Sequence, residues 1–197
     1  MNIGCIVLAA GKGERFGGRK LTRDLLGKPV LERTLEAVMA APFSRRICVV
    51  REDATEEICR RNSMPSVRYA GGPLSESIRL GMEQMLEMDG CMFVNADQPL
   101  LSSISLKRMC DVFSESPDAI LRLSFQGRPG SPVLFPKASF PALLRLQGET
   151  GGREVIRSGE YPIAFLEAEK ASELLDVDTE ELFRKAEEIL RQSISAH

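Results

Sequence analysis

The chain has 197 residues, of which 43% are hydrophobic and 27% charged, and its formal net charge is −2. This is the composition of an ordinary globular protein that is long enough to bury one sizeable core. A charge so close to zero excludes a strong overall field for nucleic acid or an anionic membrane, and no apolar run is long enough to span a bilayer. We therefore expect neither nucleic acid nor a membrane as a partner.

Cysteine and histidine usage limits the chemistry. The five cysteines form no C-x-x-C pair, and three of them lie inside apolar runs, which is typical of buried side chains in a reducing compartment. The N-terminus shows no signal-peptide pattern, so we expect a cytoplasmic protein. Because the only histidine is the last residue, His197, any catalysis must rest on carboxylates, cations, backbone groups or a metal ion.

Apolar runs alternate with helical patterns along the chain. Strands are expected at 3–8, 46–50, 67–70, 91–95 and 119–123, with helices at 29–40, 53–61, 75–88 and 103–113 between them. After these we expect a loop at 126–130, strands at 131–135, 161–166 and 174–177, short helices at 138–146 and 152–158, and a closing helix at 179–192. This rhythm predicts an α/β fold in a single domain over residues 1–197, with three α/β/α layers, a Rossmann-like arrangement and a mostly parallel sheet.

The stretch from Leu8 to Lys20 follows the first strand and is rich in glycine and in cations. Its glycines are Gly11, Gly13, Gly17 and Gly18, and its cations are Lys12, Arg15, Arg19 and Lys20. Glycine allows close backbone approach, successive N–H groups form a nest for anions, and arginine and lysine match phosphates. An ordinary turn is the alternative, but such a turn needs only about two to six residues. The pattern therefore indicates a triphosphate-binding loop.

The spacing of this loop excludes two familiar phosphate motifs. It lacks the G-K-[ST] ending of a P-loop. It also departs from the dinucleotide fingerprint, because Phe16 occupies the place of the third glycine. A nicotinamide-dependent dehydrogenase is therefore disfavoured.

Two carboxylates, Asp97 and Asp178, each follow an expected strand. Ligands of open parallel sheets bind beyond the carboxyl ends of the strands, so both side chains are expected at the edge that carries the glycine loop. Each has a plainer alternative: Asp97 could form a turn before Gln98, and Asp178 could cap the closing helix. Together with an anionic ligand they favour Mg²⁺, which commonly binds one or two carboxylates plus phosphate oxygens.

Two further segments are candidates for ligand contact. Gly71 and Gly72 end the third expected strand and permit close approach to a nucleotide, and Ser75 or Ser77 could donate from the start of the next helix. A glycine turn with a serine cap is the alternative. The prolines and glycine of the segment 128–132 predict a shaped binding loop.

These residues together resemble the MobA-like nucleotidyltransferases. The matching segments are Leu8-Ala9-Ala10-Gly-x-Gly-x-Arg-Phe-Gly-Gly-x-Lys, Gly27 to Arg33, Ala96-Asp97-Gln98-Pro99, Gly130 to Phe135, and Asp176-Val177-Asp178-Thr179. They occur in the family's order and cover nearly the whole chain. Within the family, the Leu-Ala-Ala-Gly form is most similar to the molybdenum cofactor cytidylyltransferases (MocA-type). One departure is that Asn95 and Ala96 precede Asp97, where the family often has glycine.

The resemblance implies a nucleotidyltransferase fold and a role for each matching residue. Leu8, Ala9, Ala10, Gly11, Gly13, Arg15 and Lys20 would bind the nucleotide, Arg15, Lys20 and Asp97 would serve catalysis, and Asp97 and Asp178 would hold Mg²⁺. Ala10 would select CTP over GTP. The segments 130–132 and 148–153 would face the pterin of the molybdenum cofactor.

The implied reaction is attack by the terminal phosphate of the molybdenum cofactor on the α-phosphorus of CTP, with release of pyrophosphate. The product would pass to a molybdenum hydroxylase or its maturation chaperone. Two alternatives remain open. One is another nucleotidyltransferase that acts on a sugar phosphate or methylerythritol phosphate, and the other is a non-catalytic module that binds a nucleotide or cofactor.

Overall fold

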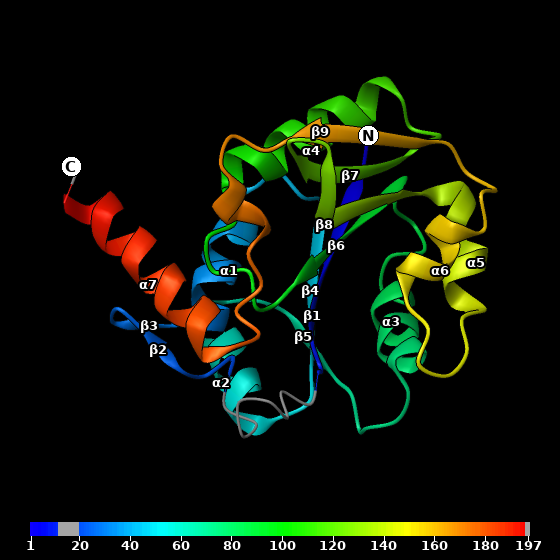
Figure 1. The fold of residues 1–197 in the computed structure, drawn as a ribbon. Helices are drawn as coiled ribbons and strands as arrows, with labels where there is room; N and C mark the ends of the chain where they lie inside the picture. The colour runs from blue at the N-terminus through cyan, green and yellow to red at the C-terminus, as the bar shows by residue number, and fades with distance from the viewer. Residues whose placement is uncertain (12–19, 196–197) are drawn as a thin grey trace.

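A computed structural model describes residues 1–11 and 20–195, and its centre is a seven-stranded sheet (Figure 1). The strands are β1 (Ile3–Ala9), β4 (Arg45–Val50), β5 (Ser66–Arg68), β6 (Gly90–Asn95), β7 (Ile120–Phe125), β8 (Arg128–Pro136) and β9 (Ile163–Glu167). Their order is β5-β4-β1-β6-β8-β7-β9. Only β8 runs antiparallel to its neighbours, so the mostly parallel sheet expected from the sequence is confirmed.

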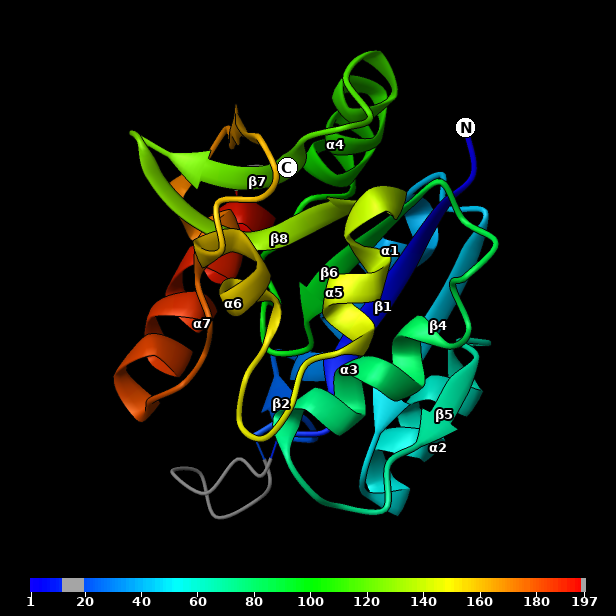
Figure 2. The same cartoon turned by 90° about the vertical axis from the view of Figure 1, so that its right-hand side faces the viewer.

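Helices cover both faces of the sheet, which gives the three expected layers (Figures 1 and 2). One face packs against α1 (Val30–Ala40), α2 (Asp53–Arg61) and α4 (Ser103–Glu115), and the other against α3 (Leu74–Met82), α5 (Phe140–Leu144) and α6 (Gly152–Arg157). Two 3₁₀ turns, η2 (Lys137–Ser139) and η3 (Ala171–Leu174), and the last helix, α7 (Glu180–Ser195), complete the fold. Within these described residues, no helix is both long and apolar enough to cross a membrane.

The first strand shows why the apolar run at the N-terminus folds as it does. Cys5 and Val7 pack into the core under α1, whereas Ile6 packs into the core under α3. A strand buried on both faces reads as a continuous hydrophobic run. This central position brings Ala9 and Gly11 to the carboxyl edge of the sheet.

The loop expected at 126–130 is instead a tight hairpin between β7 and β8, and the loop predicted at 128–132 is wrong, because these residues form the first part of β8. Gln126 and Gly127 both have positive φ, as a two-residue hairpin turn of the primed type requires. Their N–H groups donate to the Glu167 carboxylate at 2.7 and 3.1 Å. Pro129 and Pro132 are tolerated on the β6 side because β8 pairs with β6 only from Val133 onward.

Three other segments differ clearly from the sequence expectations. The helix expected at 75–88 ends at Met82, and successive three-residue turns continue to Met88. The strand expected at 174–177 is part of η3 followed by an irregular segment. A small hairpin, β2 (Asp24–Leu25) with β3 (Lys28–Pro29), precedes α1 and packs with α7 in a third apolar cluster. These differences involve short elements, for which periodicity carries little information.

The start of β6 provides a stability prediction. A Cβ at Gly90 would lie 2.5 Å from a ring carbon of Phe113 and 3.0 Å from a methyl group of Leu134, and both side chains are buried. We expect Gly90→Ala to lower the free energy of unfolding by about 1–3 kcal/mol in urea titrations, because the overpacked core must shift. The pair Gly90→Ala and Phe113→Leu should lose less than the sum of the single losses, since leucine leaves room. Strict additivity would contradict this explanation.

Candidate active site

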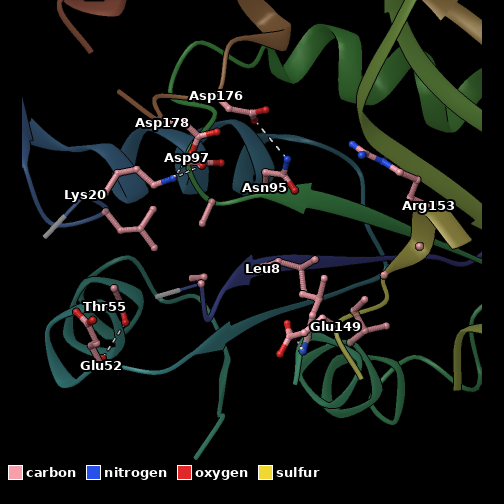
Figure 3. Close-up of a pocket in the computed structure, with 18 residues that line it drawn as sticks. Leu8, Lys20, Glu52, Thr55, Asn95, Asp97, Glu149, Arg153, Asp176 and Asp178 are labelled. Atoms are coloured by element: carbon pink, nitrogen blue, oxygen red, sulfur yellow. Dashed lines mark hydrogen bonds and ion pairs between the residues drawn. The ribbon is translucent and has the colours of Figure 1, made fainter. Parts of the chain in front are cut away.

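A cleft of about 560 Å³ opens at the carboxyl ends of β1 and β6 (Figure 3). Its walls come from the last residues of these two strands, from the beginnings of α2, α3 and α6, and from Lys20 and Leu21. The segment before α7 contributes Asp176 and Asp178. The cleft therefore lies where open α/β sheets bind their ligands.

Lys20 joins the two carboxylates singled out in the sequence. Its Nζ donates to Asp97 Oδ2 at 2.5 Å and to Asp178 Oδ1 at 2.7 Å, as the dashed lines in Figure 3 show. The side chains of Lys20 and Asp97 are each only 15% exposed. Burial opposes the charged form of Lys20, but the attraction of the two aspartates and their hydrogen bonds outweigh it and raise the pKa of Lys20. Oxygens from two distant segments thus converge on one cation position.

Backbone hydrogen bonds hold the Asp97 segment in place. The Ala96 N–H donates to the Leu8 carbonyl at 3.3 Å, which ties the end of β6 to β1. The buried Thr34 hydroxyl donates to the Ala96 carbonyl at 3.0 Å. The Val177 N–H donates to the Asp97 carbonyl at 3.0 Å, so the chain before α7 is attached directly to the Asp97 turn. These contacts explain how two aspartates 81 positions apart meet in one site.

A second set of contacts fixes α7 against the segment after Lys20. Arg23 donates to both carboxylate oxygens of Glu180, with Nη2 at 2.9 Å from Oε1. Its guanidinium also lies 3.8 Å from the centre of the Phe183 ring. The Thr179 hydroxyl accepts from the Leu182 N–H at 3.2 Å and so caps the helix. Asp178 is thereby left to face Lys20, and the alternative that Asp178 is the capping side chain is not what the structure shows.

Asp176 is a further carboxylate in the cleft, and the sequence reasoning did not select it. Its Oδ1 accepts from Asn95 Nδ2 at 3.3 Å. Burial, followed by the negative charge of Asp97, raises the pKa of Asp176 to about 6, although the bond from Asn95 favours the ionised form. The D-x-D spacing of Asp176 and Asp178 is visible in the sequence and is the signal from which this side chain could have been found.

The charge balance of the cleft bears on metal binding. Among its described lining residues, Lys20 and Arg153 face five carboxylates, those of Glu52, Asp97, Glu149, Asp176 and Asp178. A polyphosphate would be repelled by such walls unless a cation accompanied it. Within 1–11 and 20–195, no three His, Cys, Asp or Glu side chains are grouped so as to hold a metal ion by themselves. Mg²⁺ is commonly coordinated by one or two carboxylates together with phosphate oxygens, and Asp97 and Asp178 could supply the two carboxylates.

The structure brings six of the predicted site residues to the cleft: Leu8, Ala9, Gly11, Lys20, Asp97 and Asp178. Gly13 and Arg15 lie outside the described residues. Ala10 is buried in the apolar cluster under α3 and is not part of the cleft wall. Gly71, Gly72 and Ser77 do not line it either, and the Ser77 hydroxyl donates to the Leu74 carbonyl at 2.8 Å. The assigned roles of all these residues stay predictions.

Other residues that line the cleft were either not predicted from the sequence or were noted there for another reason. Glu52 and Thr55 come from the start of α2, and the Thr55 hydroxyl donates to the Glu52 carbonyl at 2.8 Å. Asn95 was noted only as a departure from the family pattern. Arg153 belongs to the segment expected to face the acceptor, and Figure 3 shows its side chain extending from α6 toward the side where Asn95 and Asp176 lie.

The comparison with protein families agrees with this geometry. The model of the MobA-like NTP transferase domain matches residues 5–164, which include most of β1, Lys20 and Asp97. The chain belongs to the MobA-like NTP transferase family. As a member it is an NTP-dependent nucleotidyltransferase, and the expected α/β nucleotidyltransferase fold is confirmed. The narrower resemblance to molybdenum cofactor cytidylyltransferases stays a prediction.

Three relatives show the range of this family. Purine catabolism protein PucB of Bacillus subtilis (strain 168) is 30% identical over 190 residues, covering 89% of this chain and 91% of that protein. The structure of Rv0371c from Mycobacterium tuberculosis H37Rv has a TM-score of 0.80 at 26% identity and covers 95% of this chain and 98% of that one. Rv0371c has also been solved as a complex with manganese, at 25% identity and a TM-score of 0.78. The 2-C-methyl-D-erythritol 4-phosphate cytidylyltransferase of Dechloromonas aromatica (strain RCB) is 31% identical over 127 residues, 57% of this chain and 54% of that protein.

Proposed function

We propose that this nucleotidyltransferase transfers CMP from CTP to the terminal phosphate of the molybdenum cofactor and releases pyrophosphate. The observation that carries the proposal is the meeting of two segments in one cleft. Lys20, Asp97 and Asp178 form one wall, and the segment of Glu149, Gly151, Gly152 and Arg153, which the family resemblance associates with the pterin, forms another. A donor nucleotide and an acceptor phosphate would therefore meet beside the same carboxylates. The product would pass to a molybdenum hydroxylase or its maturation chaperone.

The chain's own residues would act by positioning and charge. Lys20 Nζ stands at the junction of Asp97 and Asp178 and would donate to phosphate oxygens of the bound nucleotide. The two carboxylates would hold Mg²⁺, which when bound neutralises phosphate charge and polarises the phosphorus toward attack. Arg153 would orient the incoming acceptor phosphate. The acceptor oxygen forms the new bond to the α-phosphorus as the bond to pyrophosphate breaks, so the reaction requires no protein nucleophile.

Support for a divalent ion comes from a relative as well as from the donor set. The solved complex of Rv0371c with manganese is similar over 95% of this chain. Two carboxylates that converge on one cation position suit Mg²⁺ or Mn²⁺ equally. We propose Mg²⁺ as the working ion.

A pyrophosphate-release screen tests the proposed reaction. CTP, GTP, ATP and UTP would each be incubated with the protein, Mg²⁺ and one acceptor: molybdenum cofactor, methylerythritol phosphate or a sugar phosphate. We expect release only with CTP and molybdenum cofactor, and none after chelation of the metal. Release with methylerythritol phosphate would instead favour the activity of the Dechloromonas relative. Nucleotide binding without release for any acceptor would indicate a binding module.

Nucleotide choice gives a separate prediction at Ala10. The residue follows β1 directly and lies between two residues of the cleft wall, Ala9 and Gly11. We expect Ala10→Gly to raise the use of GTP relative to CTP, because removal of the methyl group alters how closely the backbone approaches the base. A competition assay with equal CTP and GTP measures the ratio. An unchanged ratio would remove Ala10 from the argument for CTP.

A further inference from the structure

A row of four residues crosses the sheet from the central strand β6 to the outer edge at β9. Strand register places Phe93 of β6 beside Val133 of β8, Val133 beside Arg122 of β7, and Arg122 beside Phe165 of β9. Residues paired in register point to the same face. Phe93 is buried in the core under α3, α5 and α6, so the whole row lies on that face. Three strand spacings carry it about 14 Å away from β6.

The outer end of this row is exposed. In Figure 2, α3, α5 and α6 lie in front of the sheet, and none of these three helices stands in front of β7. Phe165 is 56% exposed, whereas its neighbours Ala164 and Leu166 pack into the core on the opposite face. A large aromatic side chain exposed beside an arginine is a surface on which a flat ring can stack.

Two arginines next to this surface lack acidic partners. Arg122 and Arg153 form no hydrogen bond or ion pair with any residue of the described chain, and the Arg122 Nε is buried without an acceptor. Burial, followed by the positive charge of Arg153, lowers the pKa of Arg122, so the two guanidinium groups repel each other. An unpaired buried donor and two like charges destabilise a fold unless an anion joins them.

The carboxylate closest in sequence on that face is already engaged. Glu167 follows Phe165 by two residues, so it points to the same side of β9. Its oxygens accept from the Ser124 hydroxyl at 2.8 Å and from the Gln126 and Gly127 N–H groups. Glu167 therefore serves the β7–β8 turn and leaves both arginines for a ligand.

We propose that Arg122, Arg153 and Phe165 form an acceptor shelf, and that the acceptor it binds carries a phosphomonoester and a flat ring. The phosphate would lie at Arg153, which lines the cleft that holds Lys20 and Asp97. The ring would lie over Phe165, with Arg122 between the two parts. This inference deepens the proposed function, because it assumes that the occupant of the shelf is the acceptor of the transfer.

The charge and the position of the shelf favour this occupant. Two unpaired guanidinium groups match a dianionic phosphate in the forked geometry that arginine provides. Arg153 is itself part of the cleft wall, so a ligand seated on the shelf would have its phosphate end in the cleft that holds Lys20 and Asp97. A ring-free phosphate would leave Phe165 without a contact.

Direct binding measurements test the shelf independently of catalysis. The probe is the fluorescent oxidised pterin obtained from molybdopterin, used with its phosphate intact and after removal by a phosphatase. The chain contains no tryptophan, so pterin fluorescence can be followed without interference. Glycerol 3-phosphate serves as the ring-free competitor, and CTP affinity is measured in parallel. The full chain is used throughout.

The variants are Arg122→Met, Arg153→Ala and Phe165→Ala, each with a matched control. Arg157→Ala removes an exposed arginine one turn further along α6, and Ile163→Ala removes an exposed apolar side chain from the same face of β9. We expect each arginine variant to weaken binding of the phosphorylated pterin about tenfold or more and to bring it near the phosphate-free form. Phe165→Ala should also lose about tenfold, and the controls and CTP affinity should change less than about twofold.

A stability measurement keeps the test independent of misfolding. Arg122→Met removes a buried donor that has no partner, so its unfolding temperature should equal or exceed that of the parent chain. The proposal is overturned if the arginine variants bind the pterin phosphate like their controls, if CTP affinity falls equally, or if the parent binds it no better than glycerol 3-phosphate. If the shelf effects appear while CMP transfer to molybdenum cofactor does not, the shelf stands and the proposed reaction fails.

Discussion

Asp97→Asn and Asp178→Asn should each reduce pyrophosphate release by about 100-fold or more, with little change in thermal unfolding. Both carboxylates converge on the Lys20 amine at 2.5 and 2.7 Å, the position that a divalent ion and the nucleotide phosphates would share. Asparagine keeps the size of the side chain but removes the charge that holds the ion. The fold should tolerate either change because Lys20 retains the other aspartate as its partner, and the backbone ties at Ala96 and Val177 do not depend on the carboxylates.

The matched control for these variants is Asp111→Asn. Asp111 is an exposed carboxylate on α4 that pairs with Lys107 one turn earlier, at 2.7 Å. Exposed pairs of this kind contribute little to stability, so this variant should keep normal turnover and a normal unfolding temperature. Near-normal turnover in both cleft variants would contradict the metal assignment. An equal loss in the control would point to a general effect of charge.

Lys20→Ala should lower turnover but raise the affinity for Mn²⁺. A lysine with a purely structural role would not produce both changes. Turnover should fall by about 100-fold because a phosphate ligand is lost. Binding of Mn²⁺ in the absence of nucleotide should become about tenfold tighter, because the amine no longer competes for the oxygens of Asp97 and Asp178. Titration of the free protein with Mn²⁺, followed by electron paramagnetic resonance, measures this affinity directly.

Lys28→Ala provides the comparison for Lys20. Lys28 forms a single exposed ion pair with Glu36 and lies away from the cleft wall. Its removal should change neither turnover nor Mn²⁺ affinity. If Lys20→Ala left Mn²⁺ affinity unchanged or weakened it, the lysine and the metal would not share a position, and the two aspartates would need another role.

The deeply buried strands were predictable because each one leaves a continuous apolar run. Strands β1, β4 and β6 are buried on both faces, and the alternation of their apolar runs with helical patterns predicts the fold class. Asp97 was predicted at the carboxyl edge for the same reason, because it follows β6. Asp178 was predicted there from a strand at 174–177 that the structure does not contain, and the Val177 N–H bond to the Asp97 carbonyl holds that segment at the edge instead. Residues 12–19 of the glycine loop lie outside the described chain.

The second half of the chain was harder to predict because its strands are short, interrupted by proline, or covered on one face only. The segment 128–132 reads as a loop, yet the two-residue turn at Gln126 and Gly127 draws it into β8. The burial pattern of β9 alternates, and its Phe165 is exposed although phenylalanine is usually a core residue. The local sequence of a strand does not determine which part of the sheet the helices leave exposed.

The amino-acid sequence by itself determined the α/β architecture, the family and the two carboxylates, because burial, glycine and charge are local properties with regular spacing. Only the tertiary structure decided which groups meet. It placed Lys20 between Asp97 and Asp178, added Asp176 to the cleft, buried Ala10, and set the unpaired Arg122 beside Phe165. These outcomes depend on strand register and on backbone bonds between segments far apart in the chain, such as Val177 to Asp97, which no local pattern encodes.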